Sequence, residues 1–149
     1  MADNLCNQAE NGLALLVFNR TTYSAMGLAD STGPANFYLS LHTGDPGEAG
    51  DATTSEAAAG LTGYSRKTII RSSGAGGFTV TNGIAVNASD IVFTITAGTP
   101  ALMTYGGLSI YASGAGALFA GGIIASGGVT LGPGVTATIA AGSLSFELK

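Results

Sequence analysis

Short β-favouring segments separated by turn residues dominate the sequence from residue 37 onward and constrain its fold most. Phe37, Leu39 and Leu41 alternate with more polar neighbours, which is the period of a half-buried strand. Turn residues follow at 45–47, and Thr-Asn-Gly at 81–83 is typical of a tight hairpin. Further strands are predicted at 64–71, 78–82, 84–87, 91–96, 103–111, 117–124, 129–131, 135–140 and 144–148. The sequence therefore predicts an all-β fold, a β-sandwich of jelly-roll-like or Greek key type.

One segment near the N-terminus predicts a helix instead. Asn7 and Glu10 have the spacing of a helix start, with Asn7 as the N-cap. An apolar stripe then follows through Leu13, Leu16 and Val17, and residues 21–23 favour an end to the helix. We expect residues 1–23 to form an N-terminal arm and helix, and residues 24–149 to form a single β-sandwich domain.

Charged residues are scarce, at 9% of the chain, and the deficit is concentrated in one region. From Ser72 to Leu148 the charged residues are Asp90 and Glu147 alone. Such a surface is hard to keep monomeric, because net charge opposes association. We therefore expect much of it to be covered by copies of the same chain or by a partner, with Ser109 and Thr138 facing that interface.

The composition excludes several classes of protein. Disorder requires low hydrophobicity and high charge, whereas this chain is 46% hydrophobic. No apolar run approaches the length of a membrane span, so no membrane partner is expected. The chain has five basic residues, too few for a nucleic-acid-binding face. The first residues lack the basic and apolar regions of a signal peptide, so we expect the protein to be made and kept in a cytoplasm, or to be assembled there into something larger.

Candidate catalytic residues are few. Ser40, His42 and Asp45 have the residue types of a hydrolytic triad, but side chains of one strand face project in parallel rather than converge. We expect the His42 imidazole to face solvent or an interface, and Asp45 to serve the turn before Pro46. A single Cys, Cys6, and a single His give no ligand spacing for a metal, so no catalytic residue, metal or cofactor is predicted.

The remaining polar features are assigned to loops and to partner contacts. Glu48, Asp51 and Glu56 could hold Ca²⁺ but fit a solvated loop better. Paired glycines at 106–107 and 121–122, inside predicted strands, indicate bulges, bends or a close approach of another backbone. The basic cluster at 66–71 is expected on an exposed strand edge. The candidate partner contacts are Arg20, His42, Asp45, Arg66, Lys67 and Arg71.

Several segments resemble a family of small tailed-phage virion structural proteins, of the decoration (cement) or tail-fibre-like kind. Residues 39–50 read Leu-Ser-Leu-His-Thr-Gly-Asp-Pro-Gly-Glu-Ala-Gly and resemble that family's Y-x-x-L-H/F-T-x-D-P-G segment. In the same chain order, segments similar to the family's G-Y-x-R, N-A-x-x-I-x-F, H-F-G-I, L-L-Y-x-G and F-A-A-G-A-L lie at 62–66, 87–93, 105–108, 118–121 and 140–144. Tyr105 and Gly106 stand where the family has His and Phe.

This resemblance implies a non-enzymatic virion protein with a β-sandwich fold that associates with itself and with other virion proteins. The main interpretation is a capsid cement protein, a homotrimer bound to the major capsid protein on the outer capsid surface. The alternative is a tail fibre or baseplate structural or adaptor protein. A third alternative is a soluble β-domain of host origin or an uncharacterised enzyme.

Overall fold

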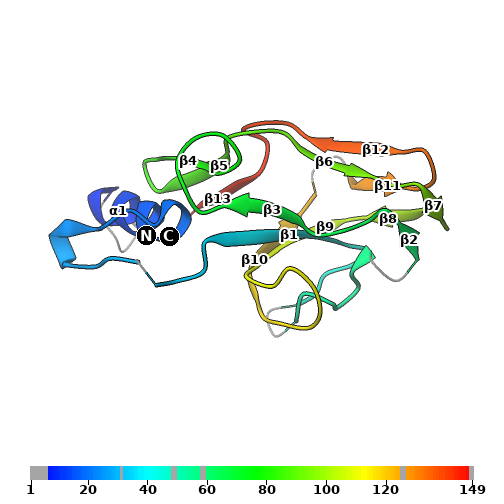
Figure 1. Ribbon diagram of the computed structural model, residues 1–149, viewed down its shortest axis with the longest axis horizontal. Helices are drawn as coiled ribbons and strands as arrows, with labels where there is room; N and C mark the ends of the chain where they lie inside the picture. The colour runs from blue at the N-terminus through cyan, green and yellow to red at the C-terminus, as the bar shows by residue number, and fades with distance from the viewer. Residues whose placement is uncertain (1–6, 31, 48–49, 58–59, 125–126, 148–149) are drawn as a thin grey trace. The chain divides into compact units, whose positions relative to one another are not determined.

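The computed structural model describes residues 7–30, 32–47, 50–57, 60–124 and 127–147. One α-helix, α1 (Asn7–Asn19), and a short 3₁₀ helix, η1 (Ser24–Met26), precede the strands in the described part of the chain (Figure 1). The strands are β1 (Asn36–His42), β2 (Leu61–Thr62), β3 (Lys67–Ile70), β4 (Phe78–Thr81), β5 (Ile84–Asn87), β6 (Ile91–Thr94), β7 (Ala97–Gly98), β8 (Ala101–Met103), β9 (Tyr105–Ser109), β10 (Leu118–Ile123), β11 (Val129–Leu131), β12 (Thr136–Ile139) and β13 (Ser145–Glu147). All strand pairs with an assigned register are antiparallel. The expected mainly-β class with one N-terminal helix is confirmed.

The predicted strand at 103–111 is in fact two strands, β8 and β9, divided at Thr104. The Thr104 N–H donates to the His42 carbonyl at 2.9 Å, whereas its own carbonyl accepts from the Ile124 N–H at 2.8 Å. The sequence also overextends the strand at 64–71, of which the structure has 67–70, and misses the two-residue strands β2 and β7. Such short pairings are set by distant partners rather than by local pattern.

The described chain divides into two compact units. Unit 1 comprises residues 1–36, 69–90 and 139–149, and unit 2 comprises residues 37–68 and 91–138. The chain therefore passes from one unit to the other four times.

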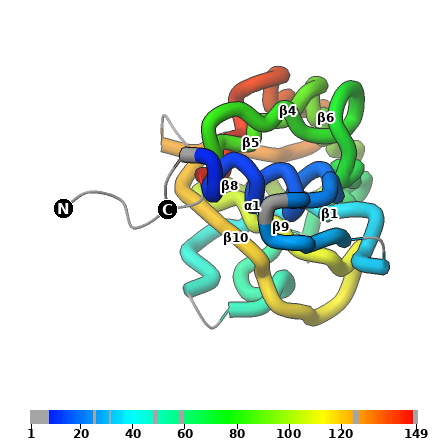
Figure 2. Tube along the Cα trace, turned by 90° about the vertical axis from the view of Figure 1, so that its left-hand side faces the viewer, coloured from blue at the N-terminus to red at the C-terminus, as the bar shows by residue number. Residues whose placement is uncertain are grey.

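Unit 1 combines α1 with the three-stranded sheet β13-β5-β4, and α1 packs against β4 and β5 (Figures 1 and 2). The helix buries Ala14 and Phe18 completely, while the predicted stripe Leu13, Leu16 and Val17 is only half-buried. The Phe18 ring centroid lies 4.9 Å from that of Phe78 and 5.7 Å from that of Phe146. The helix thus contributes its largest side chain to the core of this unit.

The hairpin between β4 and β5 is confirmed at the predicted residues. Asn82 and Gly83 have φ values of 51° and 78°, and Thr81 pairs directly with Ile84. Two consecutive left-handed residues are what a two-residue turn needs to match the strand twist, and Asn-Gly adopts that conformation at least cost.

Arg71 links the end of α1 to the segment that follows it in unit 1. Its guanidinium donates to the carbonyls of Leu16 and Val17, in the last turn of the helix, and to that of Pro34. It also forms an ion pair with Asp30, with Nη2 and Oδ2 2.5 Å apart. A cation near carbonyls that lack intrahelical partners stabilises a helix C-terminus.

The Asp30 carboxyl gives this link a pH dependence. Burial, the largest influence, would raise its pKa, but hydrogen bonds from Arg71 and the Gly33 N–H and the charge of Arg71 outweigh burial. The pKa therefore lies below its ordinary value of 3.8. Because the pKa of Asp30 is lower in the folded state than in the unfolded state, its ionised carboxylate stabilises the fold at pH values above the unfolded-state pKa. This stabilisation is lost as the pH falls through the folded-state pKa.

We expect Asp30→Asn to lower the free energy of unfolding at about pH 6 and to matter progressively less as the pH approaches about 3. Urea unfolding of both proteins across this range measures the difference. A difference that stays constant with pH would show that the Asp30 charge does not contribute.

Unit 2 contains β9, β10 and the residues of β1 and β3 from 37 to 68, which belong to the sheet β10-β9-β1-β3. It also contains the strand pairs β11-β8 and β2-β7, together with β6 and most of its partner β12. Its fully buried side chains include Leu39, Phe93 and Leu108. Ser109 is also fully buried, so its expected place on an assembly face is wrong, whereas Thr138 is exposed. No helix within the described ranges is both long and apolar enough to span a membrane.

Candidate functional site

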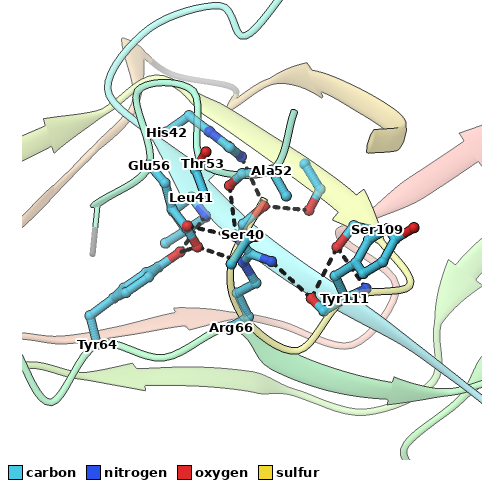
Figure 3. Close-up of polar contacts among 12 residues, drawn as sticks. Ser40, Leu41, His42, Ala52, Thr53, Glu56, Tyr64, Arg66, Ser109 and Tyr111 are labelled. Atoms are coloured by element: carbon cyan, nitrogen blue, oxygen red, sulfur yellow. Dashed lines mark hydrogen bonds and ion pairs between the residues drawn. The ribbon is translucent and has the colours of Figure 1, made fainter. Parts of the chain in front are cut away.

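Ser40 and His42 form a buried hydrogen-bonded pair on β1. Ser40 Oγ lies 2.8 Å from His42 Nε2, and His42 Nδ1 lies 2.7 Å from the carbonyl oxygen of Thr54 (Figure 3). Because a carbonyl oxygen only accepts, Nδ1 carries a proton and donates to Thr54. The Ser40 hydroxyl also donates to the Gly107 carbonyl at 3.1 Å, so Ser40 bridges the His42 ring and β9. The expectation that these two side chains cannot converge is wrong, since neighbours on one strand face can still bridge directly when the ring turns toward the hydroxyl.

The pair is not arranged for nucleophilic catalysis. His42 and Ser40 are both 0% exposed, so the imidazole does not face solvent as predicted. Asp45 is exposed and its Oδ1 accepts from the Gly47 N–H at 2.8 Å, which confirms its role in the turn. The group that orients the imidazole is therefore a backbone carbonyl, and the pair fixes the Thr54 segment to β1.

Gly107, opposite Ser40 in the β1–β9 register, provides the space for this pair. A Cβ at Gly107 would lie 2.7 Å from His42 Nε2, 2.8 Å from Leu118 Cδ2 and 3.1 Å from Ser40 Oγ. The expected close approach at this paired glycine is made by side chains of β1 and β10 rather than by another backbone.

Gly107→Ala is expected to lower the free energy of unfolding by about 1–3 kcal/mol, because the added methyl displaces the buried pair. The matched control is Gly106→Ala, in the same strand, where the nearest atoms to an added Cβ are 3.8 and 3.9 Å away. Urea unfolding of the two variants compares them. Equal destabilisation by both variants would mean that the loss of a glycine, and not the steric clash at Gly107, determines the change in stability.

Arg66 is the centre of a second buried network in unit 2. Its Nε and Nη2 donate to the two carboxylate oxygens of Glu56, at 2.7 and 2.8 Å. Its Nη1 donates to the Tyr111 carbonyl, and Nη2 also contacts the carbonyls of Ala52 and Gly114, all within 3.0 Å (Figure 3). The side chains of Arg66 and Glu56 are only 2% and 8% exposed.

This network joins two loops. Residues 51–57, called loop A, supply Glu56 and the Ala52 carbonyl, while residues 111–117, called loop B, supply the Tyr111 and Gly114 carbonyls. The Ala52 N–H also donates to the Gly116 carbonyl at 2.7 Å. A planar guanidinium with five donors can satisfy a carboxylate and several carbonyls at once, which an ammonium cannot.

Tyr64 completes the network from the segment before β3. Its hydroxyl accepts from the Leu41 N–H at 2.9 Å and donates to Glu56 at 3.3 Å. Burial raises the pKa of Tyr64 well above its ordinary value of 10.0, and the Glu56 charge adds to this, so the hydroxyl stays protonated. The hydrogen bond with Glu56, despite burial, raises the pKa of Arg66. Tyr64 therefore stays neutral and Arg66 stays charged.

The structure separates the six candidate contact residues into two groups. Arg66 and Arg71 are each 8% exposed and His42 is buried, so the expectation of an exposed basic edge is wrong for these arginines. Their guanidiniums bond to backbone carbonyls of the same unit, which sequence spacing could not reveal.

The other candidate contacts lie at or near the surface. Asp45 is exposed, and Lys67 is half-buried with its Nζ 5.5 Å from the ring centroid of Phe93. Arg20 is half-buried and its Nε donates to the Asp30 carbonyl at 3.1 Å. Contacts of these residues with a partner stay a prediction.

Among the residues that the structure describes, no group of three or more His, Cys, Asp or Glu side chains could hold a metal ion. Asp51 accepts from the Thr53 N–H and hydroxyl, which lower its pKa and make it a turn residue. Glu56 is bound to Arg66. Cys6 and Glu48 lie outside the described residues.

Comparison with known proteins identifies the family. A search of curated proteins gave no match. The family described as "Podophage GP4 fiber I protein gp80" matches residues 5–147, which is nearly the whole chain. The match supports a non-enzymatic structural component of the phage virion, and it favours the tail-fibre interpretation over capsid cement. The chain belongs to this podophage fibre protein family.

Proposed function

We propose that this chain is a structural subunit of a phage tail fibre that associates with itself and binds other virion proteins through loops A and B. The observation that carries the proposal is the Arg66 network, which holds two otherwise irregular loops in fixed positions beneath an exposed surface. The homotrimer expected from the sequence stays a prediction.

The exposed atoms of the two loops suit protein contact. Thr53, Thr54 and Ser55 of loop A are exposed, as are residues 111–115 of loop B, where Tyr111 is 41% exposed. Tyrosine with small hydroxyl and glycine residues is the composition that antibody loops use, because these residues contact diverse surfaces at little entropic cost. Preorganised loops also lose less conformational entropy on binding.

Purified particles test the location of the chain. About a dozen copies or fewer per particle, found at the tail by antibody labelling in electron microscopy, is expected for a symmetric tail assembly. Hundreds of copies on the capsid surface would instead support the cement interpretation.

The loop surface is tested with two matched variants, each of which replaces an exposed alanine with glutamate. Ala112→Glu places a charge on loop B, whereas Ala75→Glu places one on an exposed turn of unit 1. We expect Ala112→Glu to reduce incorporation into particles by about tenfold or more and Ala75→Glu to leave it within about twofold, with both variants folded by circular dichroism. Equal incorporation of both variants would contradict a contact through loop B.

A further inference from the structure

We propose that the free edge of β10 binds an extended peptide segment of a different virion protein by β-strand addition. The inference deepens the proposed function and rests on it, because the occupant is a virion protein. Strand addition pairs an incoming extended chain with the unpaired backbone groups of an edge strand.

Among the residues that the structure describes, β10 is paired along one edge only. It is the terminal strand in the order β10-β9-β1-β3, so β9 covers only one of its sides. The Ile124 N–H, just after the strand, donates toward β9 at the Thr104 carbonyl. Because N–H groups of an antiparallel strand alternate in direction, those of Gly121 and Ile123 point to the side away from β9.

A cavity lies along this edge. It has a volume of about 390 Å³ and is lined on one side by the five consecutive residues 118–122 of β10. The register shift between Leu118 and Ala120 interrupts the alternation of side chains, and Gly121 and Gly122 beyond it contribute only backbone to the lining. At ~3.3 Å per residue the lined edge is about 16 Å long, which accommodates an added strand of four to five residues.

The part of the edge from Gly121 to Ile123 lacks the usual protection against pairing. Edge strands are commonly blunted by charged residues, proline or bulges. Residues 118–124 contain no charged residue or proline, and the register shift of the pairing with β9 lies earlier, between Leu118 and Ala120. Phe119 and Ile123 are 48% and 75% exposed, and nothing lies within 4 Å of a Cβ built at Gly122. The sheet face is therefore open at Gly122, and exposed apolar side chains lie on either side of it along the strand.

The opposite wall identifies the kind of occupant. Asp45, Pro46 and Gly47 line the same cavity together with Tyr105 of β9, so the space is a groove between the two strands and a turn. Such a groove admits a lone extended segment, whereas the sheet edge of a second folded copy would need the turn to move aside. Asp45 is the one charged residue in the lining, so the segment carries uncharged residues along β10 and a basic side chain beside Asp45.

Two substitutions at Gly121 separate the effect of losing its backbone N–H from the effect of adding a side chain. Both Gly121→Ala and Gly121→Pro add a Cβ, which would lie 3.2 Å from the Gly106 carbonyl oxygen, but only proline removes the outward N–H. In phage that carry each variant, we expect incorporation into particles to fall about tenfold or more for Gly121→Pro and to stay within about twofold for Gly121→Ala. Equal incorporation of the two would overturn strand addition.

A cross-linking measurement does not depend on the folding of the proline variant. Phage particles are assembled with the photoreactive p-benzoylphenylalanine in place of Phe119, irradiated, and analysed by mass spectrometry. The expected adduct lies on one short segment of a different virion protein that contains a basic residue. An adduct only on a second copy of this chain, or no adduct, would overturn the inference while the proposed function stands. Absence of the unsubstituted chain from particles would overturn both.

Discussion

Arg66→Met is expected to lower the free energy of unfolding by about 3–5 kcal/mol, the cost of leaving one partner of a buried ion pair uncompensated. Glu56, with a side chain only 8% exposed, would lose both of its guanidinium hydrogen bonds. The carbonyls of Ala52, Tyr111 and Gly114 would lose a donor at the same time. Urea unfolding monitored by tyrosine fluorescence measures the change.

Two further variants separate charge from geometry at this position. Arg66→Lys keeps the charge but not the planar fork, so we expect it to recover only part of the loss. The double variant Arg66→Met with Glu56→Leu removes the stranded carboxylate, so it should be more stable than Arg66→Met alone. A loss of about 1 kcal/mol or less for Arg66→Met, the size typical of an exposed ion pair, would contradict the buried network.

Phe18→Ala is expected to cost about 3–5 kcal/mol, because it removes a fully buried aromatic side chain and leaves a cavity between Phe78 and Phe146. Thermal unfolding followed by circular dichroism measures the change. The matched control is Gln8→Ala, at an exposed position of the same helix, which should have little effect. Equal melting of the two variants would show that the helix does not support the core of unit 1.

The Phe18 result also bears on the N-terminal arm expected from the sequence. The prediction that residues 1–23 reach a neighbouring chain stays open to test. The burial of Phe18 adds that removing them should unfold unit 1 as well as weaken attachment, so the substitution is a cleaner probe than truncation.

Sequence patterns correctly predicted the secondary-structure elements that are determined by residues close together in the chain. The Asn82-Gly83 hairpin follows from the conformational preferences of two adjacent residues, and β1 follows from its alternation. The helix was placed correctly, but its buried face was not, because Phe18 meets Phe78 and Phe146 from distant segments.

The polar network could not be predicted in the same way. His42 is buried because Gly107, 65 positions later, leaves room for it, and Arg66 is buried because carbonyls from two loops converge on it. Sequence alone assigns a basic residue to the surface by default, since burying a charge is costly unless it is paired. The pairing depends on tertiary structure, which spacing does not encode.

The four crossings of the chain between units carry a consequence for biosynthesis. The helix, β4 and β5 of unit 1 are complete at residue 87, but β13, which completes their sheet, follows only after all of unit 2 has been translated. The nascent chain must therefore keep the apolar faces of an unfinished sheet apart from other chains while residues 88–144 are made. Slow, non-local closure of this kind exposes a chain to aggregation. Phage yield should accordingly depend on host chaperone capacity and on the speed of translation through the second unit.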